Sequence, residues 1–169
     1  MESNASGVYY QKSDYANFAL RLSTLIIDLA LSAGFGFALD AVAESASLTS
    51  GQYDTIIVVF LFLYFIEMKR RYGTIGNIVT RTRLIDVSGK RPSIYSMLVR
   101  SSLFVLGSLF FIIDIIWVTS DEKRQMIRDK FSGIYVIKRK AQPLGHGKVI
   151  YSSCMIASLN FLFKDVETN

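Results

Sequence analysis

The chain has 169 residues, of which 51% are hydrophobic and 20% are charged, and its net charge at neutral pH is +5. Soluble domains are usually about one-quarter charged, and the apolar residues here are gathered into runs that approach membrane-spanning length. With one cysteine and one histidine, the chain has no disulfide scaffold and too few ligands for a structural zinc site. The composition predicts a small integral membrane protein, and we expect no metal, no cofactor and no nucleic-acid partner.

Two apolar runs follow a polar N-terminal segment, residues 1–20. The first run, residues 22–42, has 21 residues, and a helix that crosses a bilayer needs about 20. An Ala-x-Ala pattern lies at its end, but the acidic residues before and within the run favour a retained helix over a cleaved signal. The second run, residues 55–68, reaches a full span when Tyr53 and Tyr72 are added as interfacial anchors.

The basic residues predict the orientation of these helices. Residues 69–100 hold eight Lys or Arg against one Asp, whereas residues 44–54 hold none. Because cytoplasmic loops are enriched in Lys and Arg, residues 69–100 and the N-terminus are predicted to be cytoplasmic. We expect the basic segments to face anionic lipid or a membrane partner. The residues concerned are Arg70, Arg71, Arg81, Arg83, Lys123 and Arg124.

The third apolar run, residues 101–119, creates a conflict of topology. Residues 121–140 hold seven Lys or Arg and also favour the cytoplasm, yet one crossing would place them outside. Either the run is a re-entrant hairpin that turns near Gly107, or the charge rule is overridden. Residues 83–87 and 133–138 resemble strands, and their pairing would favour the hairpin.

The chain as a whole is therefore predicted to be an all-α membrane protein. Residues 21–140 form its membrane domain, with three hydrophobic helical segments, of which the third crosses or re-enters, and a small cytoplasmic two-strand element. The tail, residues 141–169, contains an apolar stretch of about 15 residues that is short for a span. An interfacial helix, paired strands and a fourth span all remain open for it.

Charged residues inside the apolar runs are the candidates for function. On a helical wheel, Arg21, Thr24, Asp28 and Ser32 form one polar stripe. An unpaired carboxylate in a membrane helix costs about 2.5–3.5 kcal/mol on insertion scales. Asp28 is therefore protonated, or binds a cation, or pairs with Arg21 or another basic group. It is either a proton or cation site on a transport path or part of a buried pair that locks the helices. Asp114 is a second candidate, with a capping or solvated role as the alternative.

The opposite face of the first helix carries Ala30, Gly34 and Ala38. Small residues four positions apart allow two helix backbones to approach closely. We expect this ridge to contact a neighbouring helix or a second copy of the chain. Transport would require such an oligomer, because three helices are too few to enclose a pore.

Three motifs in order carry a family resemblance. Arg21 precedes Asp28 in the first helix, Thr74-Ile75-Gly76-Asn77 follows the second apolar run, and Asp129 comes four residues before Gly133 and a strand. In these motifs, over about residues 15–139, the chain resembles the RDD family of bacterial membrane proteins, named for one arginine and two aspartates. Asp129 corresponds to the second aspartate, and Arg100 fits a recurrent arginine. Asn77 and Arg128 depart from the lysine and histidine that are common there.

The resemblance implies a multi-pass protein of the bacterial inner membrane. Transport has been proposed for the family, including sodium–proton exchange for some members. The ion or proton site candidates are then Arg21, Asp28, Asp114 and Asp129. The alternative is a non-catalytic accessory or scaffold protein that binds anionic lipid or a membrane partner. We expect no enzymatic activity, because no pairing of a nucleophile with a base is visible.

Overall fold

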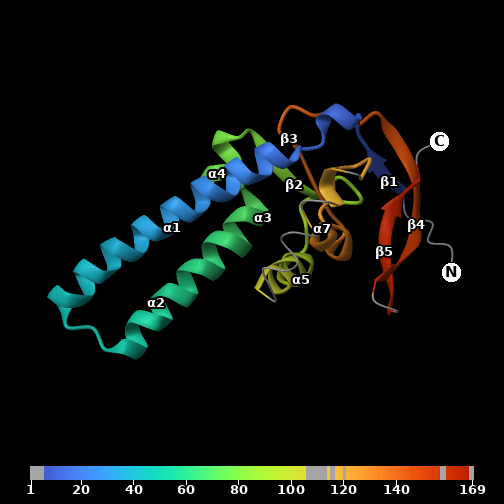
Figure 1. Ribbon diagram of the computed structural model, residues 1–169. Helices are drawn as coiled ribbons and strands as arrows, with labels where there is room; N and C mark the ends of the chain where they lie inside the picture. The colour runs from blue at the N-terminus through green and yellow to red at the C-terminus, as the bar shows by residue number, and fades with distance from the viewer. Residues whose placement is uncertain (1–5, 106–113, 115–116, 120, 157–158, 168–169) are drawn as a thin grey trace.

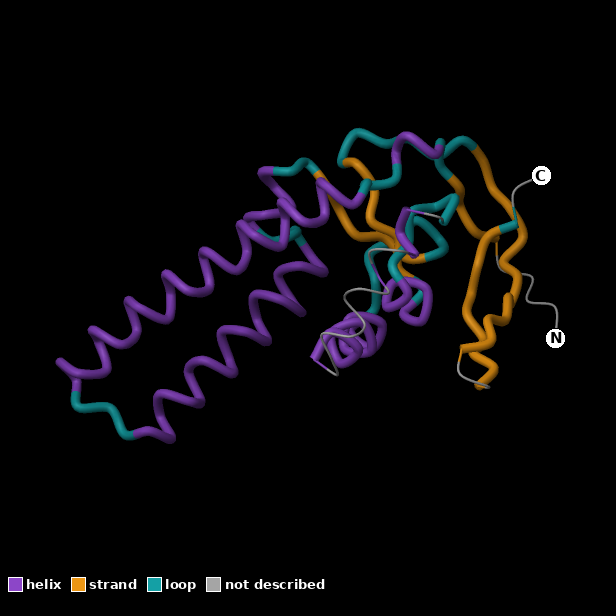
Figure 2. Tube along the Cα trace, viewed as in Figure 1, coloured by secondary structure: helices purple, strands orange, loops and turns teal. Residues whose placement is uncertain are grey.

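The protein combines a long helical hairpin with a lobe that contains strands (Figures 1 and 2). The computed structural model describes residues 6–105, 114, 117–119, 121–156 and 159–167. The hairpin is formed by α1 (Phe18–Ala46) and α2 (Ser50–Phe62). Within the described ranges, two helical segments are long and apolar enough to cross a membrane, Phe18–Ala46 and Ser50–Val79. The first two predicted apolar helices are confirmed.

Local sequence signals start both hairpin helices. The side chain of Asn17 accepts a hydrogen bond from the backbone N–H of Leu20 and so caps α1. Thr49 and Gln52 form a reciprocal capping box at the start of α2. Large apolar side chains point outward from both helices, with Phe37 76% exposed and Val58 64% exposed. Such surfaces are suited to lipid rather than water.

The second helical segment changes its winding before it ends. It continues from α2 into the π-helical η2 (Leu63–Met68) and α3 (Lys69–Arg71), and a turn at Gly73 leads to α4 (Ile75–Val79). A π segment has more residues per turn than an α-helix and is frequent at functional sites. Here Tyr64 lies within it and Lys69 follows directly after it, and both side chains reach α1.

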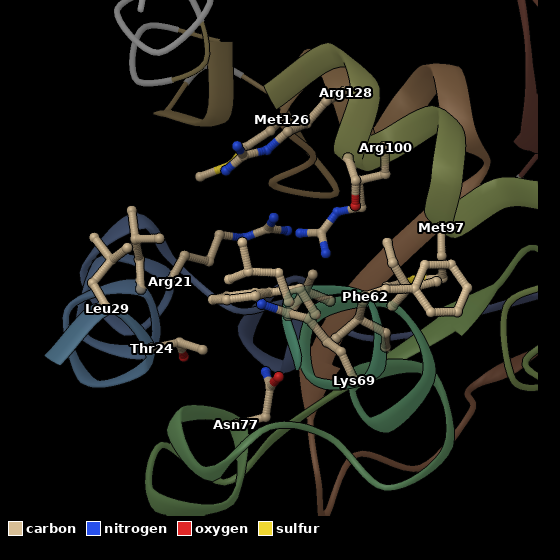
Figure 3. A pocket seen from close by; sticks show the side chains of 17 residues that line it. Arg21, Thr24, Leu29, Phe62, Lys69, Asn77, Met97, Arg100, Met126 and Arg128 are labelled. Atoms are coloured by element: carbon tan, nitrogen blue, oxygen red, sulfur yellow. The ribbon is translucent and has the colours of Figure 1, made fainter. Parts of the chain in front are cut away.

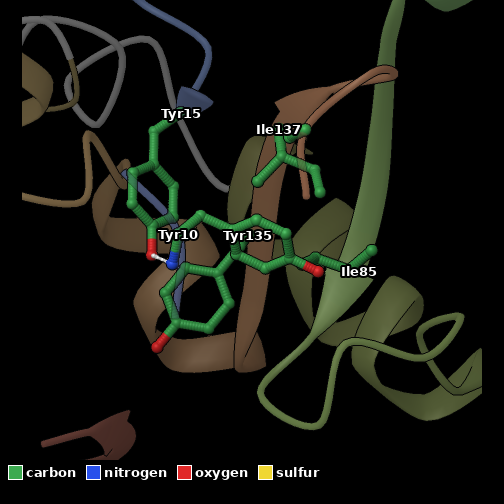
Figure 4. Close-up of a cluster of buried hydrophobic side chains, with 6 residues drawn as sticks. Tyr10, Tyr15, Ile85, Tyr135 and Ile137 are labelled. Carbon is green, nitrogen blue, oxygen red and sulfur yellow. Dashed lines mark hydrogen bonds between the residues drawn. The ribbon is translucent and has the colours of Figure 1, made fainter. Parts of the chain in front are cut away.

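A two-stranded sheet forms the centre of the lobe. β2 (Thr82–Asp86) pairs antiparallel with β3 (Ile134–Lys138), with Leu84 opposite Val136. This confirms the predicted two-strand element. Because side chains alternate along a strand, the sheet packs on both faces. Tyr10, Tyr15, Ile85, Tyr135, Ile137 and Ala141 form one cluster (Figure 4), and Ala16, Ile66, Leu84, Met97, Ile134 and Val136 form the other.

The tail forms paired strands, one of its three open alternatives. β4 (Gly145–Ile156) pairs antiparallel with β5 (Leu159–Val166), and β1 (Ser6–Tyr9) pairs with the start of β4. The sheet order is β1-β4-β5, so the polar N-terminal segment and the tail share one sheet. The all-α prediction is thus too narrow, since the mostly helical chain has five strands in its described part. A strand of four residues whose partner lies far along the chain leaves no local pattern to detect.

The third apolar run is described only in part. α5 (Ile94–Val105) includes its beginning and is seen nearly end-on in Figure 1, so it lies across the axis of the hairpin. The predicted turn at Gly107 lies outside the described residues. Arg100 of α5 contacts Asp129 of α7 (Ile127–Ser132), and Oδ1 of Asp114 accepts a hydrogen bond from the N–H of Ile127 at 2.9 Å. Arg100 and Asp114 therefore both lie beside α7.

Candidate functional site

Asp28 is fully buried on α1, and four donors surround its carboxylate. Oδ1 accepts hydrogen bonds from the Tyr64 hydroxyl at 3.0 Å and from the Gly76 N–H at 2.9 Å. Oδ2 accepts one from the Thr74 hydroxyl at 2.7 Å and lies 3.4 Å from Nζ of Lys69. Lys69 is thus the basic partner that a carboxylate in an apolar helix needs. Because these donors occupy both oxygens, the carboxylate has little capacity left to bind a cation.

The segment 74–77 is shaped to hold this carboxylate. Thr74 and Asn77 form a capping box that starts α4, which turns the Thr74 hydroxyl and the Gly76 N–H toward α1. A Cβ atom at Gly76 would lie 2.6 Å from Oδ1 of Asp28 and 2.4 Å from the carbonyl oxygen of Thr24. Only glycine allows this approach of α4 to α1.

Asp129 is the second fully buried carboxylate, in the first turn of α7. It forms ion pairs with Arg21 of α1 and with Nε of Arg100 of α5, the latter at 2.6 Å. Burial raises the pKa of Asp129, but Arg100 and Arg21 outweigh burial and hold that pKa well below its usual range. Arg21 also donates to the carbonyl oxygens of Ala16 at 3.1 Å and Arg124 at 2.7 Å.

The charge pairs differ from the arrangement suggested by the helical wheel. Asp28 was expected to pair with Arg21 or another basic group. Arg21 binds Asp129 instead, and Lys69 is the basic group that binds Asp28. Seven residues span about 10 Å along a helix, so two groups on one stripe need not meet. Three members of the predicted polar stripe, Arg21, Thr24 and Asp28, do lie on one buried face of α1.

Asp114 completes the group of predicted acidic candidates. It is 2% exposed, and its Oδ2 lies 3.3 Å from Nε of Arg128. Burial lowers the pKa of Arg128, and the charge of Arg100 lowers it further. Asp114, Asp129 and Arg21 therefore lie around α7, whereas Asp28 occupies its own cage of donors.

A cavity of about 450 Å³ lies next to both carboxylate sites (Figure 3). Its cationic lining consists of Arg21, Lys69, Arg100 and Arg128. Much of the remaining wall is apolar and comes from α1, α2 and η2, namely Leu25, Leu29, Leu61, Phe62, Phe65 and Ile66. Cavities of this size with few polar groups are typical of ligand sites. Within the described ranges, no cluster of three or more His, Cys, Asp or Glu could hold a metal ion.

The basic residues expected to face lipid or a partner fall into two groups. Arg71, Arg81 and Arg83 are exposed, although Arg71 also pairs with Glu67 and Arg83 donates to the carbonyl oxygen of Ala141. The other three are only partly exposed: Arg70 pairs with Glu67, Lys123 with Asp165, and Nη1 of Arg124 donates to the carbonyl oxygen of Tyr15.

The small-residue ridge faces outward. Ala30, Gly34 and Ala38 are all exposed, and a Cβ atom at Gly34 would have no neighbour within 4 Å. Its packing against another helix stays a prediction.

Tyr64, Lys69, Thr74 and Gly76 were not identified from the sequence as partners of Asp28. Thr74 and Gly76 belong to the motif Thr74-Ile75-Gly76-Asn77 identified in the sequence. This motif lies more than 40 residues after Asp28, so the sequence does not indicate that the two are in contact. The signal that could have found it is the motif's combination of a helix cap and a glycine, because such a turn presents N–H donors to an anion.

Comparison with known proteins adds one result. A family model described as RDD family matches residues 15–133, which is more than half of the chain. The matched range includes Arg21, Asp28, the segment 74–77 and Asp129. No match was found to a curated protein or to a solved structure.

Replacing Gly76 by alanine should destabilise the protein, because the added methyl group would collide with backbone and carboxylate oxygens. We expect a loss of about 1–3 kcal/mol or more, measured by thermal unfolding in a neutral detergent. Gly34→Ala is the matched control, since its methyl group meets only open space. Equal unfolding temperatures for the two variants would show that the close approach of Gly76 to Asp28 does not contribute to stability.

Acid should remove the stabilisation that Asp129 provides at neutral pH. Its pKa is lower in the folded protein than in the unfolded chain, where an aspartate has a pKa of about 3.9. The contribution is therefore fully present above that value and is lost as the pH falls toward the folded pKa. Asp129→Asn should cost about 3–5 kcal/mol at pH 7, because it leaves buried arginines without their counter-charge.

Thermal unfolding of the wild type and Asp129→Asn between pH 7 and pH 3 tests this linkage. The difference in stability between the two proteins should narrow as the pH falls. A difference that stays constant over this range would show that Asp129 does not account for the acid sensitivity.

Proposed function

Since the chain belongs to the RDD family and has two helices suited to crossing a bilayer, we propose a non-catalytic accessory role at the bacterial inner membrane. In this proposal the hairpin anchors the protein, and the base of the hairpin binds anionic lipid on the cytoplasmic side. The lobe is then available to a membrane partner. The observation that carries the proposal is a surface of exposed apolar and basic side chains at this base.

Apolar and basic side chains are exposed together where the hairpin meets the lobe. We call this surface the interfacial collar and define it as Arg71, Ile75, Ile78, Val79, Arg81, Ile94, Tyr95 and Leu98. Val79 is 61% exposed and Tyr95 is 76% exposed, and Arg71 and Arg81 lie just before and just after α4. Apolar residues beside basic ones are typical of a surface that lies in the headgroup region of an anionic membrane.

The third apolar run is part of the same proposal, as a segment that re-enters rather than crosses. Its support is that Arg100 and Asp114 both contact α7, and that β2 before the run pairs with β3 after it. α5 crosses the hairpin axis and exposes Ile94 and Leu98, which suits a helix in the plane of the membrane. Both basic segments then lie on the cytoplasmic side, in agreement with the charge rule.

Ion or proton transport is the second candidate, and one observation favours it. Asp28 is paired with Lys69 inside an apolar helical segment, and Lys69 also lines the cavity. Ionisable pairs in membrane segments often belong to proton pathways. Two spanning helices need partners for such a pathway, and the exposed ridge of Ala30, Gly34 and Ala38 offers a surface for a homo-oligomer.

The lipid proposal predicts that α4 is protected only by an anionic membrane. Amide hydrogen exchange of residues 74–80 should be several-fold slower in nanodiscs with phosphatidylglycerol than in phosphatidylcholine alone, because each surface cation contributes about 1 kcal/mol. The double variant Arg71→Gln/Arg81→Gln should lose this difference. Lys148→Gln/Lys164→Gln, on the distant β4–β5 hairpin, should retain it. Equal exchange of the wild type in both lipids would refute the proposal.

The transport candidate makes a different prediction, for proteoliposomes under a sodium gradient with a pH-sensitive dye inside. Asp28→Asn should abolish proton flux, while Asp40→Asn should retain it, because Asp40 lies far along α1 and its carboxylate accepts a hydrogen bond only from Tyr53 in the described structure. Absence of flux with the wild type would rule out sodium–proton exchange.

A further inference from the structure

The cavity has more cationic groups than the carboxylates around it neutralise. Lys69, Arg100 and Arg128 line it with side chains that are only 15%, 13% and 14% exposed. With Arg21 they make four cations. Within the described part of the chain, three buried carboxylates pair with them: Asp28, Asp114 and Asp129. A buried charge without a counter-charge is costly, so an anion in the cavity would stabilise this arrangement.

Two of the four cations have hydrogen-bond donors to spare. Each of the three nitrogens of Arg21 already makes a hydrogen bond, to Asp129 or to a carbonyl oxygen. Arg100 donates Nε to Asp129, and within the described ranges its two terminal nitrogens make no hydrogen bond. Lys69 has one hydrogen bond there, to Asp28, out of the three that an ammonium can donate. Figure 3 shows Arg21 and Arg100 extending toward each other inside the cavity.

The walls of the cavity fit a different part of a ligand. Leu29 of α1 and Leu61 and Phe62 of α2 line it and are 51%, 41% and 45% exposed. The cavity is therefore bordered by residues of the lipid-facing surface of the hairpin. A small inorganic anion would leave these apolar walls without contacts, and a neutral lipid would leave the cations without a counter-charge.

We propose that this cavity binds one anionic amphiphile, with its carboxylate or phosphate head group between Arg100 and Lys69 and its alkyl chain along Leu29 and Phe62. The volume of about 450 Å³ lies within the usual range for ligand sites. The site does not include the interfacial collar, so either proposal can fail while the other holds.

Native mass spectrometry of the full chain in a neutral detergent tests the proposal, with dodecyl phosphate as the probe. We expect one dodecyl phosphate per chain. Arg100→Gln and Lys69→Gln should each weaken binding about tenfold or more, because each removes a charge-assisted hydrogen bond. Arg139→Gln, which removes an exposed arginine outside both the cavity and the interfacial collar, should bind like the wild type.

Arg100→Gln or Lys69→Gln could unfold the protein, because each removes a buried cation. A second pair of variants therefore tests the site without removing a charge. Leu29→Trp adds bulk at the cavity wall, whereas Leu31→Trp adds the same bulk at a 40% exposed position that does not line the cavity. Binding should be lost in the first and kept in the second, with both unfolding temperatures near that of the wild type. Inorganic phosphate and dodecanol are the two control ligands, and neither should bind.

Three outcomes would overturn the proposal. Inorganic phosphate binding as well as dodecyl phosphate would show a site for a free anion, and dodecanol binding as well would show an apolar site without charge selection. Unchanged affinity in Arg100→Gln and Leu29→Trp, with both variants folded, would place the bound amphiphile elsewhere on the protein.

Discussion

Asp129 joins parts of the chain that lie far apart in the sequence. Its carboxylate pairs with Arg21 at the start of α1 and with Arg100 in the middle of α5. Without this carboxylate two largely buried guanidinium groups would face each other with no counter-charge between them, and their repulsion would weaken the contact between the hairpin and the lobe. The orientation of α1 relative to β2 and β3 depends on this pairing, since Arg21 lies within the first turn and a half of the helix.

Asp28 fixes the second hairpin helix in a comparable way. Tyr64, Lys69, Thr74 and Gly76 all donate toward it, so α1 holds the end of the second apolar segment through one carboxylate. On α1, Asp28 and Arg21, which is a partner of Asp129, lie seven residues and about 10 Å apart. The cavity lies next to the cationic partners of both carboxylates, which explains how cationic groups come to line a largely apolar space.

The sequence was sufficient for features that leave a local pattern. The apolar lengths of α1 and α2, the alternation in β2 and β3, and the burial of Asp28 are all of this kind. The partners of Asp28 and of Arg21 could not be assigned, because pairing among several cations and carboxylates depends on tertiary distances and not on spacing. The third apolar run was ambiguous for the same reason: hydropathy measures length and composition, whereas the return of Asp114 to α7 is a tertiary contact. Paired strands were one of the open alternatives for the tail, but the pairing of β1 with β4 was missed because β1 has only four residues.

The pairing of β1 with β4 imposes an order on the assembly of the protein. Ser6–Tyr9 finds its partner at Gly145–Lys148, a part of the chain that is synthesised on the order of ten seconds later at common translation rates. The hairpin has left the ribosome by then, so it can enter the membrane while the first strand still has an open edge. Unpaired edges invite aggregation. The unpaired edge of β1 must therefore be protected from aggregation while the rest of the chain is synthesised. Pairing of β1 with β4 then completes the lobe, after the hairpin has entered the membrane.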